Sequence, residues 1–159
     1  NRKLRLKGIT DFKGPVMAFT PLLQGNVAIS AGAKVIVNTF EEDEKFAGVA
    51  FHDIGTCTLA LASLKSFFAT GDLVKSAAFF AFQAEPLARI HELGRDFGQI
   101  LQTAAIEFLV NSKGQTLLVT SDDQGGLHFF CYAPNSKISS LYCILTLFLL
   151  SLCLIRLDY

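Results

Sequence analysis

The chain has 159 residues, of which 51% are hydrophobic, and its 14 basic side chains balance 14 acidic ones. This length predicts one domain with ample material for a core, and the neutral balance excludes an overall attraction to nucleic acid or to an acidic substrate. Four cysteines without a CxxC pair predict a reducing, intracellular setting. The chain begins with Asn1 rather than Met and has no signal peptide, so we expect a piece of a longer protein.

Three strands are predicted in the first part of the chain. A turn at Phe12–Pro15 comes first, because Pro does not sit inside a central strand. The strands Val16–Thr20, Val27–Ser30 and Lys34–Phe40 follow. The charged cluster Glu41–Lys45 is interpreted as a solvated loop rather than an acidic docking patch, since such clusters are ordinary between strands.

Eight further strands are predicted between residues 47 and 132. The stretch Phe67–Gln83 has the pattern of a hairpin, with a Gly-Asp corner between two runs of small and aromatic residues. Leu87–Leu93 has the three-residue apolar spacing of a short helix, but its place in the repeat favours a strand. The predicted strands are Ala47–His52, Cys57–Ala62, Phe67–Thr70, Ala77–Gln83, Leu87–Leu93, Ala104–Val110, Leu117–Ser121 and Leu127–Tyr132.

The strands repeat in a way that is typical of β-propeller blades. Similar strands begin at Lys34, Ser76 and Gly126, which are 42 and 50 residues apart. The fold class is therefore all-β: a partial β-propeller of about two and three-quarter blades of four-stranded antiparallel sheet, spanning residues 1–135. We place three strands in an incomplete first blade and begin the full blades at Ala47 and Leu87. Because a propeller typically has about four to eight blades, this part should expose blade faces and edges.

Residues 136–159 form an apolar tail, in which Ile138–Ile155 carries no charge. Three interpretations are open: a membrane-spanning helix, a further buried strand, or sequence translated from an intron. The third is favoured, because the composition changes abruptly after Asn135 and because the tail residues are those that thymine-rich codons encode.

No catalytic constellation is evident, so we expect neither an enzyme, nor a metal site, nor a cofactor. His52, His91 and His128 lie in separate strands without metal-ligand spacing, and a structural role is predicted for each. Asp72 and the pair Asp122–Asp123 lie at hairpin corners, where aspartate usually accepts hydrogen bonds from the backbone of its own turn.

Nucleic-acid contact is predicted to come from loops rather than from the Phe-rich strands. Platforms for single-stranded RNA interleave aromatic side chains with Lys or Arg, and these strands carry little positive charge, so core packing is favoured for the phenylalanines. Lys65, Lys75 and Arg95 are the candidate residues for contact with RNA.

Several short segments resemble, in order, the last propeller of the large β-propeller subunit of the cleavage and polyadenylation specificity factor. The similarity extends from Leu6 to Asn135 and excludes the tail. The segments are Phe46–Asp53 (FAGVAFHD), Ser63–Gln83 (SLKSFFATGDLVKSAAFFAFQ), Arg95–Asp96, Ala105–Val110 (AIEFLV) and Val119–Pro134 (VTSDDQGGLHFFCYAP).

The resemblance implies a nuclear scaffold without a catalytic site. It would hold other subunits of a cleavage and polyadenylation complex that recognise pre-mRNA, and it would take no small-molecule substrate. Related propeller adaptors of a ubiquitin ligase or of a splicing complex are alternatives. A protein anchored in a membrane through Ile138–Ile155 is a third. Ile138–Tyr159 departs from the family, whose members continue with further blade strands.

Overall fold

A computed structural model describes residues 3–6, 8–40, 46–98, 102–112, 114–134 and 141–148, and these form an all-β structure. A 3-10 turn, η1 (Leu23–Gly25), lies between the first two strands. The strands are β1 (Val16–Pro21), β2 (Asn26–Ala31), β3 (Lys34–Phe40), β4 (Phe46–Asp53), β5 (Thr58–Leu64), β6 (Phe67–Asp72), β7 (Ala77–Gln83), β8 (Arg89–Arg95), β9 (Thr103–Val110), β10 (Thr116–Asp122), β11 (Gly126–Tyr132) and β12 (Leu141–Phe148).

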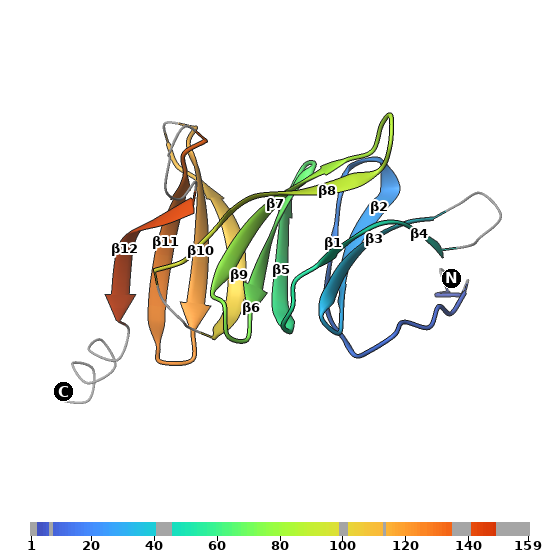
Figure 1. Ribbon diagram of the computed structural model, residues 1–159, viewed down its shortest axis with the longest axis horizontal. Coiled ribbons are helices and arrows are strands. Elements are labelled where there is room, and N and C mark those ends of the chain that lie inside the picture. Colours follow the sequence, from blue (N-terminus) through green and yellow to red (C-terminus); the bar gives the residue numbers. More distant parts are fainter. Residues whose placement is uncertain are drawn as a thin grey trace.

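The strands form three antiparallel sheets, each built from four strands that are consecutive in the sequence. The first sheet is β1–β4, the second is β5–β8 and the third is β9–β12. The sheets follow one another side by side, from the blue first sheet to the orange and red third sheet (Figure 1). The first strands of neighbouring sheets contact each other, β1 with β5 and β5 with β9. Three blade-like sheets stacked in this way confirm the predicted partial propeller.

The predicted grouping of strands into blades was wrong by one strand. The strand at residue 46 does not open the second blade, because β4 pairs with β3, where His52 lies opposite Val35. Likewise β8 pairs with β7 and closes the second sheet. A repeat in sequence gives the spacing of strands but not the link at which the chain changes sheets. Here the chain crosses between sheets after Asp53 and after Arg95. The strand predicted at 87–93 is confirmed as β8, rather than a helix.

Part of the apolar tail forms a strand, which was one of the three interpretations left open. β12 pairs with β11 over its whole length, from Leu141 opposite Tyr132 to Phe148 opposite Gly126. It completes the third sheet, but of its first seven side chains only Leu141 is buried. The boundary at residue 135 stays a prediction, and residues 149–159 lie outside the described part. In that described part, no helix is long and apolar enough to cross a membrane.

The core lies between the sheets rather than inside any one of them. One apolar cluster joins the first and second sheets, and a second cluster joins the second and third. Neighbouring residues of β7 serve both, since Phe79 faces the third sheet and Phe80 faces the first. Phe80 stacks on Phe68 at 5.1 Å between ring centroids, and both are fully buried. Each such phenylalanine contributes about 1.5–3 kcal/mol by burial.

One glycine permits a close approach between the second and third sheets. A Cβ atom at Gly71, on β6, would lie 2.5 Å from Cγ2 of Thr103 on β9. Real Cβ atoms do not approach this closely, so the two sheets can meet here only because residue 71 has no side chain.

Candidate interaction surfaces

The corner of the β6–β7 hairpin is held by the buried carboxylate of Asp72. Its Oδ1 atom accepts hydrogen bonds from the backbone N–H groups of Val74, at 2.8 Å, and Lys75, at 2.9 Å. Its Oδ2 atom accepts from the hydroxyl of Thr56, in the loop that joins the first sheet to the second. The predicted role of Asp72, accepting from its own turn, is confirmed.

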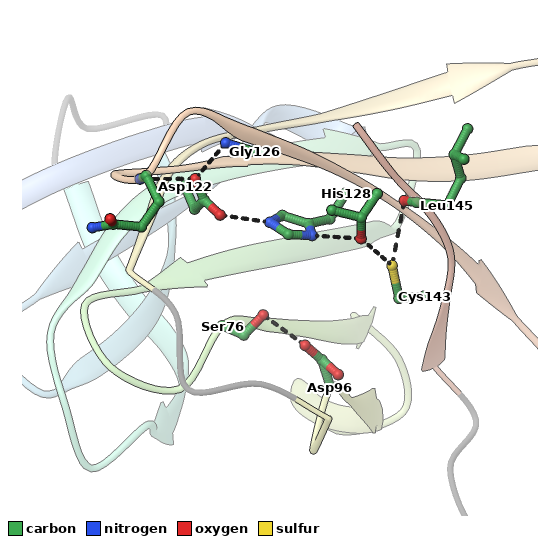
Figure 2. Close-up of polar contacts among 9 residues, drawn as sticks. Ser76, Asp96, Asp122, Gly126, His128, Cys143 and Leu145 are labelled. Carbon is green, nitrogen blue, oxygen red and sulfur yellow. Dashed lines mark hydrogen bonds and ion pairs between the residues drawn. The ribbon is translucent and has the colours of Figure 1, made fainter. Parts of the chain in front are cut away.

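The corner of the β10–β11 hairpin repeats this arrangement and adds a histidine (Figure 2). Asp122 Oδ1 accepts from the N–H groups of Gln124, at 2.9 Å, and Gly126, at 2.6 Å. Its Oδ2 atom lies 2.7 Å from Nε2 of His128, whose Nδ1 atom lies 3.0 Å from the hydroxyl of Thr146. The three strands β10, β11 and β12 are therefore joined by one polar network. This is a structural role for His128, as predicted.

Gly126 and burial together shape this network. A Cβ atom at Gly126 would lie 2.6 Å from Asp122 Oδ2 and 3.0 Å from His128 Nε2, so only glycine leaves room for the pair. Burial favours the neutral form of Asp122, but hydrogen bonds from His128, Gly126 and Gln124 outweigh it and hold the pKa of this carboxyl below its usual value. Asp122 is 9% exposed and His128 is 4% exposed, so the pair is screened from solvent.

The three residues predicted to contact RNA do not form one patch. Lys65 lies in the β5–β6 turn, whereas Lys75 lies in the β6–β7 turn at the opposite end of the second sheet. Arg95 ends β8 at the same end as Lys75. The guanidinium of Arg95 donates to both carboxylate oxygens of Glu92, at 3.1 and 3.0 Å. Its side chain is only 13% exposed.

Glu92 also connects the first and second sheets. Hydrogen bonds from Arg95 have the largest effect on the pKa of Glu92 and lower it; burial partly opposes them, and His52 lowers the pKa further. The Nε2 atom of His52, on β4, lies 3.4 Å from Glu92 Oε2. His91 bonds Gln83 on the neighbouring strand, with 3.2 Å between its Nε2 atom and Oε1.

Most of the Phe-rich strand positions serve the core, as predicted. Phe68, Phe80, Phe82 and Phe130 are buried. Phe67 is the clearest exception, because 39% of its surface is exposed.

The outer face of the first sheet carries an apolar row that crosses all four strands. Phe19 pairs with Ile29, Ile29 with Ile36, and Ile36 with Phe51. Residues directly opposite each other in a sheet point to the same face, and this face lies away from the second sheet. Phe19 is 73% exposed and Phe51 is 64% exposed. The ammonium of Lys34 lies 4.6 Å from the Phe51 ring centroid.

The outer face of the third sheet carries two such rows. The first is Leu109, Leu117, Cys131 and Tyr142. The second is Val119, Phe129 and Leu145, and it ends at the acidic Glu107 on β9. Leu109, Tyr142 and Leu145 are each close to half exposed. Side chains of the same kind are buried where the sheets meet. The sequence predicted exposed blade faces but not which residues form them. The pattern that could have identified these residues is an apolar residue at every second position of a strand whose other positions face the core.

The charged cluster at 41–45, predicted as a loop, lies outside the described residues.

The chain is similar in sequence to proteins of one family. The family profile described as "CPSF A subunit region" matches residues 1–141. Protein cft1 of Schizosaccharomyces pombe is 31% identical over 139 residues, which cover 86% of this chain and 9% of that protein. The probable cleavage and polyadenylation specificity factor subunit 1 of Oryza sativa subsp. japonica is 37% identical over 126 residues, covering 79% of this chain and 8% of that protein.

A third relative gives the same result. The cleavage and polyadenylation specificity factor subunit 1 of Arabidopsis thaliana is 35% identical over 127 residues, covering 79% of this chain and 8% of that protein. The chain thus spans less than a tenth of the length of these three relatives. Since the profile covers all the described strands except most of β12, the chain belongs to the family of the CPSF A subunit region.

Proposed function

We propose that the chain is a non-enzymatic scaffold element of the mRNA 3′-end cleavage and polyadenylation machinery. In this role its outer sheet faces pack against further blades and partner subunits, and it acts in the nucleus. The observation that carries the proposal is the match to relatives named as subunits of a cleavage and polyadenylation factor. The apolar outer faces of the first and third sheets support it, because exposed apolar surfaces of this kind mark interaction sites.

Contact with pre-mRNA belongs to the proposal as a second, weaker part. Lys75 is the best placed of the predicted residues, because it is exposed in a turn and Arg95 lies at the same end of the sheet. Lys65 would have to contact a different part of the RNA, because it lies at the opposite end of the second sheet. Replacing Lys75 with Glu should weaken binding of an oligouridylate and reduce the salt dependence of binding by about one ion. An unchanged salt dependence would argue against this contact.

The scaffold role is tested by expressing the tagged chain in cells and measuring its co-purification with the other subunits of the cleavage and polyadenylation factor. Phe51→Lys and Leu145→Lys each place a charge on one outer face. Leu87→Lys is the matched control, because Leu87 is 59% exposed but lies in the β7–β8 loop, outside both faces. We expect the two face variants to lose the subunits and the control to keep them, with the wild-type chain in the nuclear fraction.

Other outcomes would replace this proposal. Equal co-purification of all three variants would show that the outer faces are not used. Enrichment of ubiquitin-ligase or splicing subunits instead would favour the adaptor alternatives. Recovery in a membrane fraction that is lost when residues 138–159 are removed would favour an anchor.

A further inference from the structure

We propose that a groove between the second and third sheets, at the end that carries Lys65, binds a short acidic segment of a partner protein through an apolar anchor side chain. The inference rests on the proposed scaffold function and names one site and one partner chemistry for it. The groove has a volume of about 570 Å³. This is within the range of pockets that enclose a small ligand or a few side chains.

The floor of the groove is apolar and aromatic. Phe79 lies at its centre, 5.6 Å from the Phe67 ring, 5.9 Å from Phe108 and 5.0 Å from Tyr132, measured between ring centroids. Phe79 is 8% exposed, whereas Phe67 and Tyr132 are exposed by more than a third. The inner rings are thus fixed by packing while the outer rings remain open to a ligand. Rigid aromatic walls of this kind favour insertion of an apolar side chain.

The rim of the groove is polar and carries one sign of charge. Its polar members include Gln115 and Thr116, which are both exposed. Among the lining residues, Lys65 is the charged one. Within the part of the chain that the structure describes, no carboxylate lies within ion-pair distance of the Lys65 ammonium. An exposed, uncompensated ammonium beside an apolar groove complements a carboxylate next to an apolar anchor.

Single-stranded RNA is the competing ligand, because aromatic rings beside a lysine can also stack bases. RNA binding, however, draws most of its affinity from several phosphate contacts, and Lys65 is the one cation among the lining residues that the structure describes. The lining is instead mostly apolar, and its deepest side chains, Leu118, Phe130 and Leu141, are buried. The observations therefore favour a peptide over RNA.

The test uses the purified full chain and fluorescence anisotropy with three labelled probes. The first is a short peptide with a Phe-Ser-Leu-Phe core flanked by aspartates, the second has the same core flanked by lysines, and the third is an oligouridylate. Lys65→Glu reverses the charge at the rim, and Lys75→Glu makes the same change at the opposite end of the sheet. Thr116→Trp fills the groove. Leu117→Trp places the same ring on the other face of β10, since neighbouring residues of a strand point to opposite faces.

We expect the aspartate peptide to bind the wild-type chain more tightly than either other probe. Lys65→Glu should weaken it about threefold to fivefold, because an exposed charge pair contributes at most about 1 kcal/mol. The lysine peptide should then bind Lys65→Glu more tightly than wild type. Lys75→Glu and Leu117→Trp should leave binding of the aspartate peptide unchanged, and Thr116→Trp should abolish it. If Thr116→Trp does not fold, the charge reversal at Lys65 still tests the proposal, because it changes only an exposed side chain.

Three results would overturn the proposal. One is the absence of saturable binding of the aspartate peptide. Another is that Lys65→Glu and Lys75→Glu weaken binding of the aspartate peptide equally, or that the two tryptophan variants do. The third is preferential binding of the oligouridylate that Lys65→Glu abolishes, which would make the groove an RNA site. None of these results affects co-purification through the outer faces, so failure of the groove is distinguishable from failure of the scaffold role.

Discussion

Removing the Asp122 carboxylate should cost about 3 kcal/mol of folding free energy. In the native structure this buried group accepts three hydrogen bonds, two from the backbone and one from His128. A hydrogen bond to a charged group contributes about 1.5–3 kcal/mol, and leaving a buried donor unpaired costs about 1–3 kcal/mol. The total for Asp122→Ala stays near 3 kcal/mol, since the exposed amide of Gln124 can regain water, whereas the buried amide of Gly126 is left without a partner. Asp123→Ala is the matched control, because Asp123 is adjacent but exposed.

Urea unfolding followed by far-ultraviolet circular dichroism measures both changes. The experiment is run at two low protein concentrations, so that association through the outer faces is detected. We expect the midpoint to fall strongly for Asp122→Ala and hardly at all for Asp123→Ala, with equal slopes. A difference between the two variants of less than about 0.5 kcal/mol would refute the reasoning, because it would mean that the network does not hold the hairpin.

The same carboxylate sets a pH dependence with a definite sign. Its pKa is lower in the folded chain than in the unfolded chain, so its contribution to stability is present above the unfolded value of about 4 and is lost as the pH falls through the folded value. The wild-type chain should therefore lose stability on acidification below about pH 4–5, more steeply than Asp122→Asn. Parallel acid titrations of the two chains would contradict this assignment.

Three further predictions concern packing. Gly71→Ala should destabilise the chain by about 1–3 kcal/mol, and adding Thr103→Ser, which removes the clashing methyl group, should recover part of that loss in urea unfolding. Phe80→Ala should cost about 3–5 kcal/mol, because the ring is fully buried; a loss below about 1 kcal/mol would show that the core is loosely packed. The wild-type chain should associate in sedimentation velocity, and Phe51→Lys with Leu145→Lys should reduce that association; a monodisperse, cooperatively melting wild-type monomer would contradict it.

Local features of the sequence were enough to predict the hairpins and the core. The corner at Asp72 was identifiable because a Gly-Asp pair separates two β-type runs, and both runs are strands. The burial of Phe68 and Phe80 followed from the unbroken apolar character of those runs, which is typical of strands covered on both sides.

The links at which the chain leaves one sheet for the next could not be predicted in the same way. The link after Asp53 crosses between sheets, whereas the link after Asp72 is a hairpin within one sheet. Both links have four residues and mix apolar with polar side chains. The difference between them depends on packing between sheets, which no local pattern records. The tail strand at 141–148 was ambiguous for a related reason: an apolar run of that length suits a strand or part of a helix.

The polar network around His128 was only half visible in the sequence. Asp122 and His128 flank a tight turn, so a contact between them could have been suspected. Thr146 joins them through the pairing of β11 with β12, in which His128 lies opposite Thr146. The outer faces and the groove likewise depend on the register of all four strands in a sheet, and this is why the residues predicted to contact RNA were chosen by charge alone.

The position of the core between the sheets has a consequence for synthesis on the ribosome. The first sheet emerges with Val35 and Val37 uncovered, and it is closed only when β6 and β7 deliver Phe68 and Phe80. The second sheet is covered in turn only when the third sheet supplies Leu118. Folding should therefore proceed from the N-terminal sheet to the C-terminal sheet, with each new sheet packing on the one before it. If translation stalls between two sheets, the nascent chain would expose the apolar inner face of its last completed sheet to chaperones. As translation resumes, that face is covered and the inner face of the next sheet becomes the exposed one.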